Sequence, residues 1–376
     1  MSKSPNLETT GPRGLKKRRW ADLFVGAPLV WLIGLFHRKR HLPDNINTVV
    51  LLQTAAIGDT LLMAAGIRRL RSRLPGAKVI LILGRDNKVA AQLLPPVDQS
   101  LSVNVLHPWT TLKIIRSLRA DVFVDYGTWP RINALLTALS GSAYTAGFRT
   151  SGQSRHFAYD FVADHSNARH ELSNQGGLLD FLGGTDIFSS ALELPPGGLP
   201  CQLPAGGFVV FHAWASGTGK RLKEWPADRW GELARWVHAQ NLALILTGGP
   251  GDVSDSEALA AVIRQTAPGI ALIMLAGRGS LLETARLLKQ ATAVVSVNTG
   301  IMHLAALLDV PTVGLHGPTN PLRWGPAGGM VAAVISDCAA CGYLNLGFEF
   351  PGQPPPCMER LEAAPVIRVL DAWLGH

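Results

Sequence analysis

Asp59 and the loop that contains it are the first residues whose type and position suggest chemistry. The loop Gln53–Thr60 follows the apolar run Thr48–Leu52, which is typical of a buried strand, and it leads into a helical pattern that extends to about Arg73. A carboxylate at the carboxyl end of a parallel strand can act as a general base. It can equally cap the helix that begins there. Position alone favours neither interpretation.

A second concentration of polar residues lies within Ala293–Pro321. The β-branched residues of Val294–Val297 predict a strand buried in a parallel sheet, and the stretch 298–300 (NTG) predicts a tight turn that opens a helix. His303 then falls in the first turn of that helix, off its apolar face. Helix N-termini at the carboxyl edge of a sheet bind phosphate. The pattern favours a phosphate site, with an ordinary strand–helix–strand unit as the alternative.

Both stretches resemble a known family. The segment NTGIMHLAALLDVPTVGLHGPTNP is similar to the nucleotide-sugar motif of the ADP-heptose:lipopolysaccharide heptosyltransferases, glycosyltransferase family 9, which has the GT-B fold. AAIGDTLLMAAGIRRL resembles the N-terminal loop of that family, whose aspartate is taken as the catalytic base and corresponds to Asp59. Many relatives carry Asp where this chain has Asn298. The similarity covers most of residues 47–360 and is strongest at 48–75 and 208–321.

The loop His212–Pro226, HAWASGTGKRLKEWP, adds cations that could surround a diphosphate. Its Lys-x-Trp-Pro matches a family pattern in which the lysine contacts donor phosphate, with Lys220 and Arg221 as alternatives. Asp252 could accept hydrogen bonds from ribose hydroxyls, although Asp255 and Glu257 lie close by. The residues that the resemblance assigns to the donor are Lys223, Asn298, Thr299, Gly300, His303 and Asp252. Cations at this point would offset the charge of a departing nucleoside diphosphate without a metal.

The resemblance implies an inverting glycosyltransferase. It would move a heptose or related sugar from a nucleotide sugar, in the family ADP-heptose, to a lipid-linked saccharide acceptor of the lipopolysaccharide core. Neither a catalytic metal nor another cofactor is expected, and the place of action would be the cytoplasmic face of the inner membrane. Two alternatives remain open: an enzyme of the same fold that uses another nucleotide sugar, and a non-catalytic member that binds a nucleotide sugar or scaffolds an envelope complex.

The net charge of +8 is concentrated at the N-terminus, where residues 1–41 hold nine basic and two acidic residues. The rest of the chain is almost neutral, which argues against nucleic-acid binding. The apolar run Leu23–Phe36 lies between KKRR and HRKR. It is short for a membrane span and contains Gly26 and Pro28. An anchor on the membrane surface is favoured over a true span, and a helix packed on the protein is the alternative.

Alternating strand and helix patterns predict an α/β protein of two Rossmann-like domains facing a central cleft. The predicted elements include strands at Lys78–Leu83 and, more weakly, near Val103–Leu106, and helices at about Leu281–Lys289 and Ala363–Leu374. The Pro- and Gly-rich segments 195–198 and 205–207 predict the linker between them. We expect an N-terminal extension (1–46), an acceptor domain (47–195), a nucleotide-sugar domain (207–360) and a closing helix (361–376).

Four cysteines are too few for a secreted disulfide framework, which favours a reducing cytoplasm. Cys338, Cys341 and Cys357 suggest a metal site, but no convincing fourth ligand is evident, and His316 is a distant candidate. Buried thiols or a local disulfide are favoured over a metal. Acceptor-binding residues are not identified. Four basic residues could meet acidic sugars or only solvent: Arg131, Arg149, Arg155 and His156.

Overall fold

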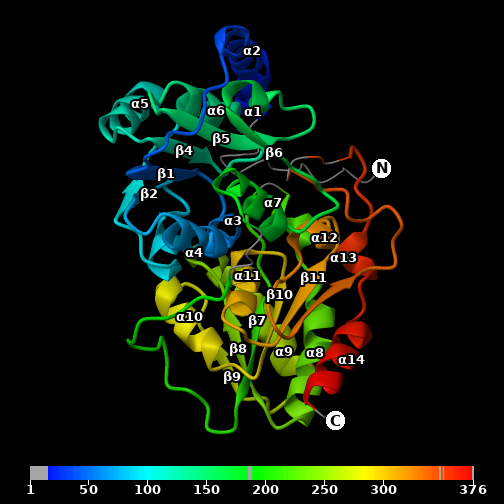
Figure 1. Cartoon of the computed structure of the whole chain (residues 1–376). Helices are drawn as coiled ribbons and strands as arrows, with labels where there is room; N and C mark the ends of the chain where they lie inside the picture. Colours follow the sequence, from blue (N-terminus) through cyan, green and yellow to red (C-terminus); the bar gives the residue numbers. More distant parts are fainter. Residues whose placement is uncertain (1–15, 185–188, 218, 347–348, 350, 375–376) are drawn as a thin grey trace. The chain divides into compact units, whose positions relative to one another are not determined.

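The computed structural model describes residues 16–184, 189–217, 219–346, 349 and 351–374, and of residues 16–18 only the backbone. The chain divides into two compact units, which meet in sequence between Leu192 and Glu193 (Figure 1). Each unit contains a six-stranded sheet in which every neighbouring pair of strands is parallel. The expectation of two Rossmann-like α/β domains is confirmed.

The sheet of the N-terminal unit has the strand order β3-β2-β1-β4-β5-β6. Its strands are β1 (Thr48–Gln53), β2 (Lys78–Leu83), β3 (Gln99–Ser102), β4 (Val122–Asp125), β5 (Tyr144–Arg149) and β6 (Phe161–Asp164). All residues of β4 and all but the first of β1 and β2 are buried, because helices cover both faces of a parallel sheet. That double burial explains their continuous apolar sequence.

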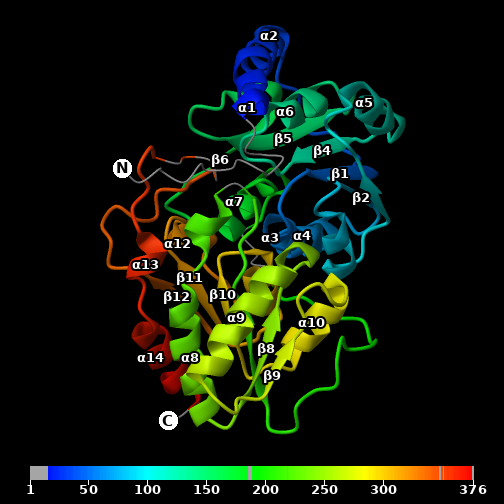
Figure 2. The same cartoon turned by 180° about the vertical axis from the view of Figure 1, so that it is seen from behind.

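Helices α4 and α7 lie on one side of this sheet, and α5, α6 and the N-terminal helix lie on the other (Figures 1 and 2). The N-terminal helix consists of α1 (Lys16–Ala21), a π turn (Asp22–Gly26) and α2 (Ala27–Phe36). The other α-helices are α3 (Ile57–Leu61), α4 (Ala64–Arg73), α5 (Pro108–Ser117), α6 (Arg131–Ala138) and α7 (Glu171–Gly177). Short 3₁₀ turns are η2 (Lys88–Leu93), η3 (Arg155–Ala158) and η4 (Asp180–Leu182).

The C-terminal unit repeats this arrangement with the order β12-β11-β10-β7-β8-β9. Its strands are β7 (Phe208–His212), β8 (Ala243–Thr247), β9 (Leu272–Met274), β10 (Ala293–Val297), β11 (Thr312–His316) and β12 (Val331–Ile335). Its helices are α8 (Ala227–Ala239), α9 (Val253–Thr266), α10 (Leu281–Lys289), α11 (Gly300–Leu307), α12 (Pro321–Trp324), α13 (Cys357–Arg360) and α14 (Ala363–Leu374), with 3₁₀ turns η5 (Lys220–Lys223) and η6 (Pro250–Asp252). Side chains of α8, α9 and α14 form one core with the sheet.

Both sheets therefore have the doubly wound order in which the first strand of the unit lies beside the fourth. The chain leaves these two strands in opposite directions across the sheet, so their loops diverge and open a crevice at the carboxyl edge. In the N-terminal unit the two strands are β1 and β4, and in the C-terminal unit β7 and β10. These are the loops in which the sequence places its candidate residues.

Two local predictions are wrong. The helix expected up to Arg73 is broken at Leu62 and Met63 into α3 and α4. The strand expected at Val103–Leu106 lies four residues earlier, as β3. Because β3 is an edge strand with alternating exposure, its sequence QSLS carries only a weak apolar signal, and the apolar residues that follow it belong to the approach to α5.

A buried ion pair lies at the carboxyl end of β4. The Arg155 guanidinium contacts the Asp125 carboxylate and the carbonyl of Gly127, and it lies 3.0 Å from the hydroxyl of Tyr159. That hydroxyl in turn donates to Asp125 at 2.7 Å. The side chains of Asp125 and Arg155 are fully buried. Burial lowers the pKa of Arg155, but the charge of Asp125 outweighs this effect and raises it, so the guanidinium stays charged.

We predict that Arg155→Ala lowers the free energy of unfolding of the N-terminal unit by about 3–5 kcal/mol, because it leaves the Asp125 carboxylate buried without its cation. Urea unfolding followed by circular dichroism measures this difference. Arg149→Ala is the matched control, since Arg149 pairs with Asp164 at 3.2 Å on the exposed surface and should cost under about 1 kcal/mol. Equal costs for the two variants would show that the buried pair does not stabilise the unit.

Candidate functional site

The β10–α11 turn of the C-terminal unit has the form of an anion site. Thr299 occupies the N-cap position of α11 with an extended backbone, and no side chain caps the first turn. The Thr299 hydroxyl lies 3.4 Å from that of Ser296. Uncapped amides at a helix N-terminus point toward the carboxyl edge of the sheet and attract negative charge. Thr299 and Gly300 are thus placed as the sequence predicts.

The side chain of Asn298 donates a hydrogen bond that an aspartate could not make. Its side-chain amide donates to the carbonyl of Trp324 at 2.8 Å and lies 3.5 Å from the ring nitrogen Nδ1 of His316. A carboxylate has no proton to donate to Trp324. The amide at this position therefore fits its surroundings, and it ties the β10 loop to α12.

The cations of the β7 loop separate into two kinds. Lys220 lies 3.9 Å from Glu224, 3.7 Å from Asp252 and 3.8 Å from Asp255. Three carboxylates around one ammonium would repel a phosphate, so Lys220 serves to join the β7 and β8 loops. Lys223 instead donates to the carbonyl of Ser216 at 2.5 Å. The surroundings of Lys220 do not suit a phosphate, and Lys223 as the phosphate ligand stays a prediction.

Asp252 is held by its own loop as well as by Lys220. Its carboxylate accepts from the backbone amide of Gly249 at 2.9 Å, which closes the turn η6 at the end of β8. Glu257 and Asp255 lie beyond this turn, on α9. Asp252 is therefore the acidic residue placed at the carboxyl edge itself, where a ribose would be bound.

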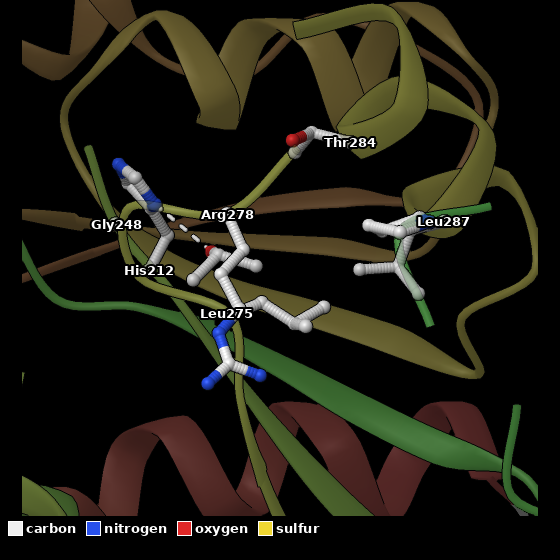
Figure 3. A pocket seen from close by; sticks show the side chains of 8 residues that line it. His212, Gly248, Leu275, Arg278, Thr284 and Leu287 are labelled. Atoms are coloured by element: carbon white, nitrogen blue, oxygen red, sulfur yellow. Dashed lines mark hydrogen bonds between the residues drawn. The ribbon is translucent and has the colours of Figure 1, made fainter. Parts of the chain in front are cut away.

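A small cavity of about 40 Å³ opens at the ends of β7 and β8 (Figure 3). Its lining comprises Pro200, His212, Thr247, Gly248, Leu275, Arg278, Thr284 and Leu287. The ring of His212 lies 3.0 Å from the Thr247 hydroxyl, the dashed contact in Figure 3. Burial lowers the pKa of His212 to about 4, so the ring is neutral at pH 7 and contributes hydrogen bonds rather than charge. The sequence analysis did not single out these lining residues.

Two further histidines lie near the same edge. His303 on α11 is buried, with 5% of its surface exposed, which differs from the expected position off the apolar face. His316 ends β11 and lies 3.1 Å from the Thr319 hydroxyl. Burial lowers the pKa of His316 to about 4 as well. The ring of His316 is therefore neutral at pH 7.

Asp59 lies on α3, directly after the β1 loop, in the N-terminal unit. Ala56, the N-cap residue of α3, has φ 56° and ψ 130°, a conformation rarely adopted by residues other than glycine and costing about 1–3 kcal/mol. Such strain is typical of functional loops, where the surroundings impose the geometry. The loop is not free to relax, because other elements hold it.

Two amide side chains hold this loop. The buried Asn87, after β2, donates to the carbonyl of Gln53 at 2.9 Å and to the hydroxyl of Thr60 at 2.7 Å. Gln175 of α7 donates to the carbonyl of Asp59 at 2.9 Å. The sequence analysis missed both residues, since nothing in the local pattern connects them with a loop more than 25 residues away. They fix the backbone from which the Asp59 carboxylate extends.

The four basic residues considered for the acceptor have mostly other partners. Arg155 is buried against Asp125, and Arg131 pairs with Asp22 at 2.6 Å. Arg149 pairs with Asp164 on the surface. Burial lowers the pKa of His156. Arg155 therefore meets neither solvent nor a sugar, and its role is structural.

Cys341 and Cys357 form a disulfide, and the Sγ atoms of these two residues and Cys338 lie within 4.8 Å of one another. A disulfide offers no thiolate, so this donor set as it stands does not fit a structural metal ion, which requires four ligands. Within the described residues His316 does not join the cluster. The local disulfide, one of the alternatives expected from the sequence, is present.

We predict that the two neutral histidines make the C-terminal unit sensitive to acid. Unfolding exposes His212, whose pKa would then rise from about 4 to about 6.5, so the unfolded chain binds more protons between these values. His212 therefore does not lower the free energy of unfolding above pH 6.5, and it lowers that free energy progressively as the pH falls toward 4. Urea unfolding at pH 7 and pH 4 should show that His212→Gln removes about 3 kcal/mol of this loss. Parallel pH profiles for the variant and the parent would contradict the assignment.

Comparison with known proteins finds a family match in the C-terminal half. Residues 196–342 match the family model of glycosyltransferase family 9 (heptosyltransferase). Lipopolysaccharide heptosyltransferase 1 of Pseudomonas aeruginosa is 32% identical over 183 residues, which are 46% of this chain and 49% of that protein. The chain thus spans about half the length, or less, of the curated relatives that it matches most strongly.

Solved structures extend the likeness to both units. Escherichia coli heptosyltransferase WaaC with ADP aligns with a TM-score of 0.65 at 20% identity, covering 87% of this chain and 99% of that one. The iron-containing dodecameric glycosyltransferase TibC of enterotoxigenic E. coli aligns with a TM-score of 0.56 at 14% identity, covering 89% and 78%. At these identities the likeness establishes the fold, which is that of the heptosyltransferases. The chain is thus similar to glycosyltransferase family 9 (heptosyltransferase) over residues 196–342, and it has the heptosyltransferase fold over both units.

Proposed function

We propose that this protein is an inverting glycosyltransferase that moves a heptose, or a related sugar, from a nucleotide sugar to a saccharide acceptor. The observation that carries the proposal is the position of the family match. Residues 196–342 contain the uncapped start of α11, the loop with Lys223 and the turn with Asp252, all at the carboxyl edge of one sheet. One edge thus offers groups for a diphosphate and for a ribose.

The donor would lie along this edge. The amides of Thr299 and Gly300 and the Lys223 ammonium would bind the diphosphate, and Asp252 would accept hydrogen bonds from the ribose. Asn298 and His303 would support the same turn. The solved structure of WaaC contains ADP, which supports an adenosine nucleotide as the donor's leaving group here. As the glycosidic bond breaks, positive groups at the diphosphate stabilise the charge that develops on it.

Asp59 would be the general base. In the proposed step an acceptor hydroxyl oxygen attacks the anomeric carbon, its proton passes to the Asp59 carboxylate, and the bond from that carbon to the diphosphate oxygen breaks. A single displacement of this kind inverts the configuration at the anomeric carbon. Asn87 and Gln175 support the role, because they hold the carbonyl of Gln53, the hydroxyl of Thr60 and the carbonyl of Asp59.

The N-terminal unit would then bind the acceptor and the C-terminal unit the nucleotide sugar. We propose a lipid-linked saccharide of the lipopolysaccharide core as the acceptor and the cytoplasmic surface of the inner membrane as the place of action. Transfer by these residues needs no metal, since lysine and helix amides supply the positive charge. The iron in TibC is a property of that protein, and here the cysteine cluster holds a disulfide.

Asp59→Asn tests the catalytic assignment. The amide keeps the size of the side chain but cannot take the proton, so the rate of transfer should fall roughly 10²- to 10⁴-fold. Affinity for the nucleotide, measured by calorimetry, should stay the same, because the donor groups are on the other unit. Asp86→Asn is the control, as Asp86 lies in the neighbouring β2 loop and has no assigned role. A full rate in Asp59→Asn would exclude Asp59 as the base.

Lys223→Ala tests the donor site. Loss of a charge-assisted hydrogen bond should weaken binding of an ADP-sugar roughly ten- to a hundredfold. Arg221→Ala, two positions away with an exposed side chain, should change it by less than about threefold. The reverse order would assign the phosphate to Arg221. Titration with ADP-, UDP- and GDP-sugars in EDTA identifies the nucleotide, and binding of none of them would favour a scaffold role.

A further inference from the structure

The N-terminal helix packs on the N-terminal unit through a narrow stripe. Gly26 and Val30 are buried, and a methyl group added to Gly34 would lie 2.6 Å from the Cβ of Phe157. Together with Asp22 these residues recur every fourth position and face α6 and η3. Because an α-helix has 3.6 residues per turn, residues spaced by four shift gradually around its axis. The wider π turn Asp22–Gly26 offsets part of that shift.

Polar clamps hold both ends of this helix to the same unit. At the start, the Asp22 carboxylate accepts from the backbone amide of Arg131 at 2.7 Å and from its guanidinium at 2.6 Å. After the end, Arg40 donates to the buried carboxylate of Asp160 at 2.8 Å, and His37 lies 3.1 Å from it. A helix that crossed a bilayer would have to break one of these two clamps.

The outward side of the helix has the greatest concentration of exposed apolar side chains among the described residues. It supplies nine of their twenty exposed large hydrophobic side chains. They are Trp20, Leu23, Phe24, Val25, Leu29, Trp31, Leu32, Leu35 and Phe36. The window Arg19–Phe36 is long and apolar enough to be a candidate span, yet only 11% of it is buried. At 1.5 Å per residue its 18 residues reach about 27 Å, slightly less than a bilayer core of about 30 Å.

The side of the N-terminal unit that carries this helix has more basic than acidic side chains. Asp22 is the only acidic residue in 16–43, and the clamp with Arg131 neutralises it. The segments 101–120 and 126–159, which form α5, α6 and their loops, contain no Asp or Glu. Helix α5 lies on the same side of the sheet as α2 and exposes Trp109, whose surface is 76% accessible, together with Lys113 (Figures 1 and 2). Apolar and basic side chains thus share one face.

We propose that this face, α1–α2 with α5 as a second contact, binds an anionic lipid surface and that the helix lies in the plane of the membrane without crossing it. Aromatic and aliphatic side chains enter the boundary of the acyl chains, and Arg38, Lys39 and Lys113 meet the lipid phosphates. The two clamps make the helix a rigid part of the unit, so membrane binding also orients the unit. This inference deepens the membrane association proposed above and is independent of the transfer reaction.

Flotation of the full-length protein with vesicles tests the lipid surface. Vesicles of phosphatidylcholine with phosphatidylglycerol should bind it, salt should weaken binding, and phosphatidylcholine alone should bind it much less. Arg38→Gln with Lys39→Gln should weaken binding about fivefold for each cation removed. Leu35→Glu with Phe36→Ser should abolish it, and Trp109→Ser should weaken it, while Ile335→Ser, an exposed apolar position of the other unit, should not. Absent binding, or binding unaffected by the substitutions in α2, would overturn the proposal.

Protease accessibility decides between an in-plane and a spanning helix. An epitope tag at the N-terminus of the full chain is followed in sealed inner-membrane vesicles whose cytoplasmic face is outward. We expect external protease to remove the tag equally fast with and without detergent, because both ends of the helix stay on the side of the folded protein. A tag that is protected until detergent is added would show a spanning helix and overturn the proposal.

Discussion

Parallel pairing of every strand is the constraint on which the rest of this structure depends. A parallel sheet needs a crossover after each strand, so both of its faces are covered and its loops gather at two edges. At the carboxyl edge the order of both sheets places the first and fourth strands side by side, with helices leaving in opposite directions. Asp59 follows the first strand of one unit, and Thr299 follows the fourth strand of the other. Their positions are consequences of topology.

The two candidate loops use different means of holding their residues. The β10–α11 turn presents backbone amides of a helix start, which need no side chain to be placed. The β1–α3 loop has an alanine in a conformation that it would not adopt alone, and amides from Asn87 and Gln175 hold the loop from two other elements. A base must be placed within hydrogen-bonding distance of one proton, whereas a diphosphate is a larger and softer target. In the proposed role of Asp59 as the base, the hydrogen bonds from Asn87 and Gln175 would serve that placement.

Buried polar groups in this protein mostly join elements that are distant in sequence. Arg155 connects η3 with the end of β4, Lys220 connects the β7 and β8 loops, and Arg131 connects α6 with the N-terminal helix. From the sequence, each of these three residues was a candidate for binding a ligand. Their partners show why a cation near a site is weak support for binding: a carboxylate within 4 Å already satisfies it. Lys223 donates to the backbone carbonyl of Ser216.

Sequence alone determined what depends on local pattern. The strands Lys78–Leu83 and Ala293–Val297, and the helices Leu281–Lys289 and Ala363–Leu374, were predicted nearly to the residue, because their apolar periodicity is continuous and turn formers bound them. The two-domain α/β architecture, the resemblance to the heptosyltransferase family and the loops of the candidate site followed from the same signals and from short motifs. Only the tertiary structure decided the partners of the charged residues, the neutrality of His212 and His316, the supports of Asp59, and the place of β3. These depend on contacts between residues far apart in the chain, and on burial, which no local pattern encodes.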